Sequence, residues 1–118
     1  MKSNEKAELL AFLDDAARWC RDAEARNSAG DAVHFDDEGA VAWDITGAVC
    51  RLFGWDRSQA IFEHMGRHML EAAVTSPFTN DAPGIDAMRA LQDFNDHTDT
   101  NYETMRTRIE NIPVNVAD

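Results

Sequence analysis

The chain has 118 residues, of which 44% are hydrophobic and 28% charged, and its formal net charge is −11. This length and composition fit a single domain with its own core and exclude a wholly disordered chain. The negative charge excludes direct binding to nucleic acid or to an anionic membrane surface, because it would repel both.

The sequence also lacks the signals of membrane insertion and export. It contains no run of about 18 apolar residues, as a transmembrane helix would need. The N-terminal stretch MKSNEKAELLAFLDDAAR lacks the uninterrupted apolar segment and the cleavage site of a signal peptide. We therefore expect one cytoplasmic domain over residues 1–118.

The first predicted helix runs from about Asn4 to Arg26, with Ser3 as its N-cap. Its apolar residues recur at steps of three and four, the pattern of an amphipathic helix. They are Leu9, Leu10, Leu13, Ala16, Ala17, Cys20 and Ala23. Residues 27–39 hold two glycines and several polar turn-formers, which predicts a loop. Within it, residues 32–35 are candidates for a short extended piece.

The second predicted helix, residues 40–53, is interpreted as the centre of the fold. Trp43 and Cys50 fall opposite its main apolar face. A helix that is apolar on both sides is expected to be enclosed by neighbours or to lie at a subunit interface. A glycine within a helix costs about 1 kcal/mol relative to alanine, so Gly47 predicts the close approach of another helix.

Three further helices are predicted over residues 56–74, 85–96 and 101–111. Prolines, a glycine and an Asn-Asp pair separate the first two, and Pro113 ends the last. The tail, residues 113–118, is expected to be frayed. The whole pattern predicts an all-α fold, a compact bundle of about five helices around the central helix.

His64 and His68 lie one helical turn apart, so both imidazoles can face one point, and Glu71 shares that side. Two histidines and a carboxylate are a minimal site for a divalent transition metal, and His97 is a candidate further ligand. Histidines on the flank of an apolar stripe more commonly pack their rings, which is the favoured interpretation. Cys20 and Cys50 form no C-x-x-C pair and are read as reduced, partly buried thiols.

The stretch FNDHTDTNYETM, residues 94–105, is rich in potential ligands. It fails the calcium-loop pattern in every register, because no register has Gly at position 6 and Glu at position 12. Thr100 and Glu103 instead form a T-x-x-E capping box, which predicts a joint between two helices. His97 and Asp99 are left without a structural role.

Asp44 lies at the edge of the apolar face of the predicted central helix. A buried carboxylate needs hydrogen bonds or a cation, and Arg51, seven residues further on, is a candidate partner. Asp44 is interpreted either as a structural acid, partly exposed or paired, or as an acid that lines a pocket.

Four stretches in order resemble an uncharacterised family of small helical proteins from bacteria and phages, a domain of unknown function with W-C-x-x-G-A-L and N-D…T motifs. They are Trp19-Cys20, ARNSAGDAV (25–33), AWDITGAV (42–49) and FNDHTDTNYETM (94–105). Asp44 stands where the family has a cysteine, so no role of that thiol carries over. The resemblance implies a helical bacterial protein and assigns no activity. The shared framework that it implies contains Trp43, Gly47, Asn95 and Asp96.

These observations favour a non-enzymatic, acidic bacterial protein that acts through protein–protein contact, either as a homodimer or on a basic partner. No cofactor and no catalytic residue are predicted. The residues expected in a pocket or interface are Trp43, Asp44, Asn95 and Asp96. The alternative is a small metal-binding protein or metal-dependent enzyme that uses His64, His68 and Glu71.

Overall fold

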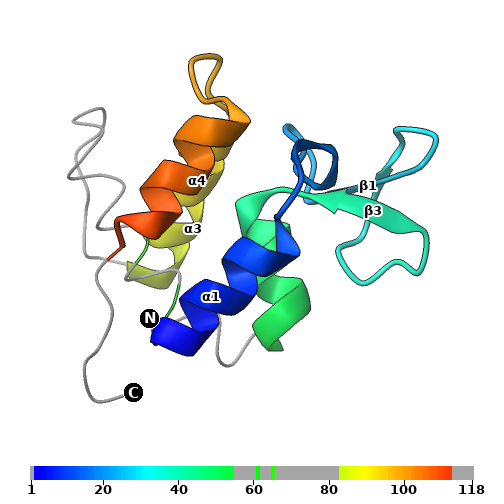
Figure 1. The fold of residues 1–118 in the computed structure, drawn as a ribbon. Helices are drawn as coiled ribbons and strands as arrows, with labels where there is room; N and C mark the ends of the chain where they lie inside the picture. The colour runs from blue at the N-terminus through cyan, green and yellow to red at the C-terminus, as the bar shows by residue number, and fades with distance from the viewer. Residues whose placement is uncertain (1, 55–60, 62–64, 66–82, 113–118) are drawn as a thin grey trace.

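The computed structural model describes residues 2–54, 61, 65 and 83–112 of the chain, and Figure 1 shows their arrangement. In chain order its elements are helix α1 (Ser3–Phe12), the 3-10 turn η1 (Ala16–Arg18), and strands β1 (Ala25–Asn27), β2 (Ala32–Val33) and β3 (Ala40–Trp43). A helix over residues 45–54 follows directly. Helices α3 (Pro83–Asp96) and α4 (Tyr102–Glu110) complete the described fold.

The prediction of an all-α bundle is wrong, because the chain contains a three-stranded antiparallel sheet in the order β2-β1-β3. Ala25 of β1 pairs with Val33 on one side and with Trp43 on the other. The strands are two to four residues long and rich in alanine. They are therefore too short to show alternation, and Val33 and Val41 are their only β-branched residues, so the usual sequence signal of a strand is weak. Residues 32–33 are extended, as expected.

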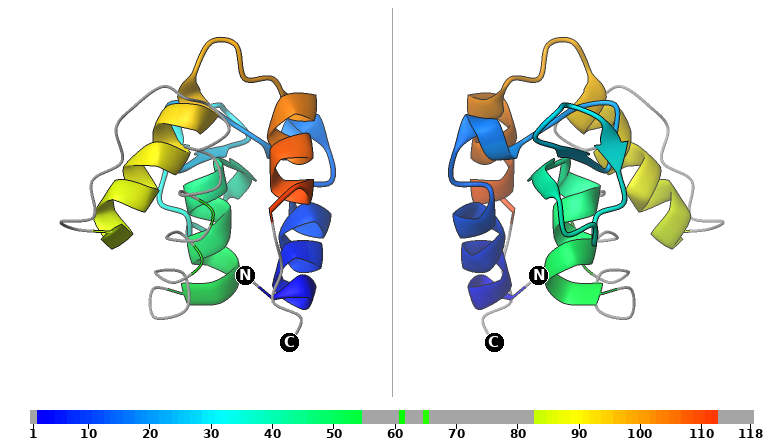
Figure 2. Two further views of the ribbon diagram at one scale, coloured as in Figure 1. Left: turned by 90° about the vertical axis from the view of Figure 1, so that its left-hand side faces the viewer. Right: turned by 90° about the vertical axis from the view of Figure 1, so that its right-hand side faces the viewer.

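Helix α1 ends at Phe12, well before the predicted end at Arg26. The carbonyl groups of its last turn are satisfied by α4, since Arg106 donates to the carbonyls of Leu10 and Leu13 at 2.8 and 2.9 Å. The hydroxyl of Tyr102 also donates to the Leu13 carbonyl. The polar ends of a helix need such partners, and here a distant part of the chain supplies them. Figure 2 shows α1 and α4 next to each other.

The predicted central helix is confirmed for residues 45–53 and wrong for residues 40–43, which form β3. Residues 42–50 are all buried, so this segment does run through the core. Trp43 lies on the strand, where its indole Nε1 donates to the Phe35 carbonyl at 3.0 Å and its ring packs against Phe12. Cys50, on the side of the helix opposite its main apolar face, is buried as well, so the helix is enclosed by its neighbours, which is one of the two expected alternatives.

The hydrophobic core joins side chains from α1, the sheet, the central helix, α3 and α4. Its fully buried large members are Leu9, Leu13, Ile45, Val49, Met65, Leu91, Met105, Ile109 and Ile112. The two C-terminal helices were predicted correctly, because their apolar residues follow a regular helical period and turn-forming residues separate them. The sheet and η1 were missed.

Several predictions lie outside the described residues. They are most of the helix over 56–74, from which the structure describes Ile61 and Met65, and the frayed tail over 113–118. The proposed metal ligands His64, His68 and Glu71 also lie there. Within the described parts of the chain, no helix combines the length and the apolar character that crossing a membrane requires.

Candidate functional site: a buried polar cluster under the 20–24 strap

Asp44 is the N-cap of the central helix rather than a residue within it. Its side-chain Oδ1 accepts from the amide of Gly47 at 2.6 Å, and its carbonyl accepts from the amide of Ala48 at 2.9 Å. Aspartate is favoured at this position because its carboxylate satisfies a free amide of the first turn. The predicted partner Arg51 does not reach it. Arg51 lies near the Phe35 carbonyl and near Asp36, at 3.4 and 3.7 Å.

The second carboxylate oxygen of Asp44 has no comparable contact. Asp44 is fully buried, and its Oδ2 has no hydrogen-bond partner among the described residues. Burial raises the pKa of Asp44 from 3.8 to about 7, the Gly47 hydrogen bond opposes this, and the charges of Asp96 and Glu24 add to it. Asp44 therefore changes its protonation near neutral pH, while an ordinary aspartate is fully ionised there.

Asn95, near the end of α3, joins three separate segments. Its side-chain Oδ1 accepts from the indole Nε1 of Trp19 at 2.7 Å and from the amide of Ile45 at 3.1 Å. Its Nδ2 donates to the Cys20 carbonyl and to Asp96 Oδ1, both at 3.0 Å. The side chain is completely buried, and its amide makes all four hydrogen bonds that its two donors and its acceptor oxygen can form.

Asp96 extends this network to the chain that passes over it. Its Oδ1 also accepts from the amide of Asp22 at 2.9 Å. Asp22 has a φ of 62°, in the left-handed region that residues other than glycine rarely enter, although aspartate tolerates it better than most. The Asn95-Asp96 pair thus holds a local turn that the chain would not adopt cheaply by itself.

The segment over residues 20–24, which we call the 20–24 strap, lies against the first turn of the central helix. The Cys20 amide donates to the Trp43 carbonyl at 3.1 Å, and the Glu24 carbonyl accepts from the Asp44 amide at 3.2 Å. A Cβ on Gly47 would stand 1.9 Å from the Glu24 carbonyl oxygen. Gly47 is therefore needed for a close approach, as predicted, but the approaching element is the strap and not a helix.

Neither cysteine is part of a disulfide, and both are buried. Burial raises the pKa of the Cys20 thiol to about 12, and the charge of Asp44 acts in the same direction. A thiol with so high a pKa is a poor nucleophile at neutral pH, because the thiolate is the reactive form. Cys20 therefore contributes to packing in this cluster and is not suited to covalent chemistry.

The 97–101 turn explains the two residues that the sequence left without a role. His97 Nδ1 accepts from the amide of Asp99 at 3.1 Å, and the His97 carbonyl accepts from the amide of Thr100 at 3.0 Å. The predicted capping box is wrong by one position. Asn101 caps α4, accepting from the Thr104 amide at 2.8 Å, while Thr100 is buried. A helix joint is nevertheless what this stretch forms.

The structure thus brings Asp44, Asn95 and Asp96 into one cluster and places Trp43 beside it on β3. Sequence reasoning missed Asp22 and, although Trp19 and Cys20 belong to the stretches that carry the resemblance, did not expect them in this cluster, because no spacing pattern connects residues 19–22 with residues 95–96. Within the described residues no group of three His, Cys, Asp or Glu side chains could hold a metal ion. The predicted metal ligands lie outside these residues, so that alternative stays a prediction.

No family model, curated protein or solved structure matches the chain. The resemblance to the uncharacterised helical family therefore stays a prediction.

The basic side chains are directed to carbonyl groups and aromatic rings. Arg26 donates to two backbone carbonyls at 2.9 and 3.0 Å, and Arg18 and Lys6 each donate to one, at 2.6 and 2.8 Å. Arg21 and Arg108 lie over aromatic rings, at 5.2 and 5.7 Å from the ring centres. Such contacts fix the position of a cation without requiring a carboxylate beside it, although Arg18 also lies 3.9 Å from Asp14.

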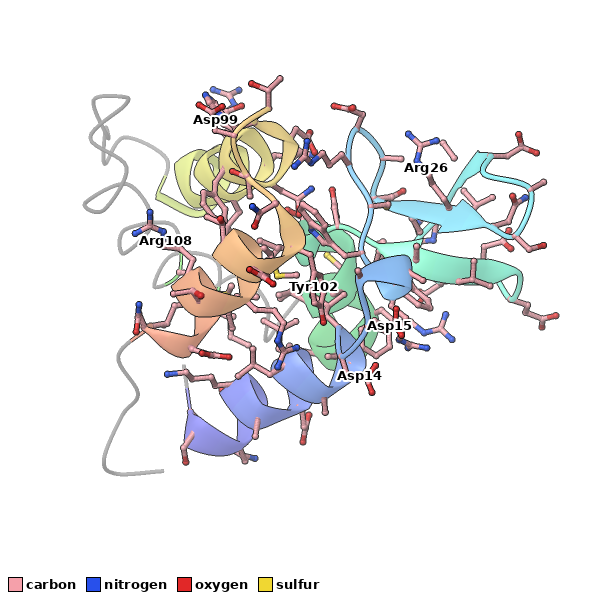
Figure 3. All side chains as sticks on the ribbon, turned by 45° about the horizontal axis from the view of Figure 1, so that its top comes forward. Asp14, Asp15, Arg26, Asp99, Tyr102 and Arg108 are labelled. Carbon is pink, nitrogen blue, oxygen red and sulfur yellow. The ribbon has the colours of Figure 1, made fainter. Side chains whose placement is uncertain are left out.

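Most acidic side chains that the structure describes are exposed or half-exposed, and few of their negative charges have a basic side chain nearby. Among the described residues, Asp14 and Asp36 form long ion pairs, with Arg18 at 3.9 Å and with Arg51 at 3.7 Å. Figure 3 shows Asp14 and Asp15 on the loop after α1, and Asp99 on the distant loop between α3 and α4. In the part of the chain that the structure describes, the exposed carboxylates are Glu8, Asp14, Asp15, Asp22, Asp31, Asp36, Asp37, Glu38, Asp93, Asp99, Glu103 and Glu110.

Proposed function

We propose that the protein is a non-enzymatic, cytoplasmic binding protein whose acidic surface docks on a basic partner protein. The observation that carries the proposal is that most described basic side chains are held by contacts within the protein, while few described carboxylates have a basic side chain nearby. Most of the described arginines contact carbonyls or rings, and Arg18 and Arg51 in addition form long ion pairs. Most of the described carboxylates, in contrast, are exposed to solvent. Uncompensated charge of one sign steers an oppositely charged partner and raises its association rate. Cys20 and Cys50 form no disulfide, which supports the proposed location, since disulfides are rare in the cytosol.

A basic partner is a better proposal than a second copy of the same chain. Two copies with a net charge of −11 each repel one another. Trp43, which suggested a subunit interface, is buried on β3. Val41 is the one large hydrophobic side chain that is exposed among the described residues, at 46%. A single side chain does not make the apolar patch of a stable dimer interface.

The proposal can be tested with a fluorescein-labelled 20-residue peptide, half of whose residues are Lys or Arg. Its affinity for the protein would be measured by fluorescence anisotropy at several NaCl concentrations. Two variants neutralise three exposed carboxylates each. One carries Asp36→Asn, Asp37→Asn and Glu38→Gln, and the other carries Asp99→Asn, Glu103→Gln and Glu110→Gln.

Both variants change the net charge equally, so each is the control for the other. If one face docks the peptide, one variant weakens binding about tenfold at low salt and the other changes it little, because each exposed pair contributes roughly 0.2–1 kcal/mol. Equal weakening by both variants would mean that the peptide responds to total charge alone. That result, or binding that does not depend on salt, would contradict the proposal.

A further inference from the structure

The 20–24 strap is held at both ends and in its middle by contacts to other elements. The Cys20 amide and carbonyl are bonded to Trp43 and Asn95, and the Glu24 carbonyl is bonded to the Asp44 amide. Between them, the Asp22 amide is bonded to Asp96 in a left-handed turn. The position of the strap in the structure thus depends on a few hydrogen bonds and includes one unfavourable backbone conformation.

Asp44 lies beneath this strap with an incomplete set of contacts. Its Oδ1 is bonded to the Gly47 amide, but the fully buried Oδ2 has no partner among the described residues. A buried carboxylate without a partner is costly when it is ionised and much less costly when it is protonated. With the strap in this position, the neutral form of Asp44 is therefore favoured.

The charged groups around Asp44 act in the same direction. Asp96, from α3, and Glu24, from the strap itself, both oppose the ionisation of Asp44. The Cys20 thiol is neutral at physiological pH, and Arg26 and Asp22 act on that thiol with opposite signs. On the central helix itself, Arg51 is turned away to Phe35 and Asp36. No described cation is bonded to Asp44.

We propose that the 20–24 strap is a proton-controlled latch, closed over the central helix while Asp44 is protonated and opened when Asp44 ionises. Opening brings the carboxylate to water and releases Asp22 from its left-handed conformation. The bonds that break are the amide contacts of Cys20, Asp22 and Asp44, while α1 and α4 stay packed. The inference does not depend on the proposed binding to a basic partner.

Linkage sets the direction and the pH range of this behaviour. The pKa of Asp44 is about 7 in the closed state and close to its ordinary value once exposed. Asp44 has its raised pKa in the closed state. The free energy by which protonation of Asp44 favours that state is therefore fully present below about pH 4 and is lost as the pH rises to 7. The population of the open strap then grows by up to about tenfold per pH unit between pH 5 and 7 and levels off near pH 8.

The test is amide hydrogen exchange followed by NMR on the full chain between pH 5 and 8. Protection factors, which remove the intrinsic pH dependence of exchange, would be compared for the amides of Cys20, Asp22 and Asp44. The Met105 amide, bonded to the Asn101 carbonyl within α4, is the internal reference. We expect protection in the strap to fall as the pH rises, by up to about tenfold per unit, while the reference stays constant.

The variant Asp44→Asn keeps an N-cap acceptor and removes the ionisable group, so strap protection should no longer depend on pH. Asp96→Asn is a second variant for the case that the first does not fold. It keeps the acceptor for Asp22 and removes a negative charge near Asp44. The pH at which strap protection stops falling should therefore be lower than in the wild type. Wild-type strap protection that is constant from pH 5 to 8, or that falls in parallel with the reference, would overturn the latch. So would an unchanged pH dependence in both variants.

Discussion

Replacing Asn95 by alanine is the most direct test of the cluster that holds the strap, the central helix and α3 together. The change removes four hydrogen bonds, to Trp19, Ile45, Cys20 and Asp96. A hydrogen bond contributes about 1 kcal/mol net, and a buried partner left unsatisfied costs about 1–3 kcal/mol. Since such costs are not additive within one network, we expect a loss of about 4 kcal/mol from the free energy of unfolding.

The matched control is Asn101→Ala, which removes the same side chain from an exposed position. Asn101 makes one cap bond, to the amide of Thr104, and loss of an N-cap costs about 1 kcal/mol. Urea unfolding followed by far-UV circular dichroism gives both free energies, and equal m-values would show that the comparison is sound. If Asn95→Ala cost no more than Asn101→Ala, Asn95 could not be the buried junction described above.

Three further predictions concern the strap, the buried acid and the end of α1. Gly47→Ala should destabilise the protein by about 2 kcal/mol despite the higher helix propensity of alanine, because the new Cβ would meet the Glu24 carbonyl oxygen at 1.9 Å; urea unfolding with equal or greater stability would disprove that contact. The pKa of Asp44 is raised from 3.8 to about 7, so its stabilising contribution is present below pH 4 and lost on the way to pH 7. The stability of the wild type relative to Asp44→Asn should therefore fall by up to about 4 kcal/mol between pH 4 and 8, and parallel pH profiles would contradict this. Arg106→Ala should cost about 2–3 kcal/mol, because two carbonyls at the end of α1 lose a charged donor; a change below about 0.5 kcal/mol in thermal or urea unfolding would show that the cap is dispensable.

The sequence predicts the elements of this fold that have a regular apolar period. The central helix over residues 45–53 and the helices α3 and α4 follow such a period and are bounded by turn-forming residues. Asn95 and Asp96 were singled out as framework residues, and the structure places both in the polar cluster. Gly47 was correctly expected at a close approach. The helix predictions and the role expected for Gly47 rest on local signals that a few neighbouring residues carry, whereas Asn95 and Asp96 were named from the family resemblance.

The rest of the fold depends on contacts between distant residues, which no local pattern encodes. The apolar spacing from Leu9 to Ala23 fits a long helix, yet α1 ends at Phe12. Arg106 and Tyr102 of α4 donate hydrogen bonds to the carbonyls at this end. The alanines of β1, β2 and β3 favour helices when considered alone. The strap is fixed by Asn95 and Asp96 from more than seventy residues away.

The contact between α1 and α4 has a consequence for how the chain folds during its synthesis. Lys6 is bonded to the carbonyl of Ile112, 106 residues away, and Arg106 is bonded to Leu10, 96 residues away. Helix α1 therefore obtains its contacts to α4 only after residues 102–112 have been synthesised. Contacts between such distant residues slow folding, and until they form, the part of the α1 surface that α4 covers stays open to chaperones and to other unfinished chains.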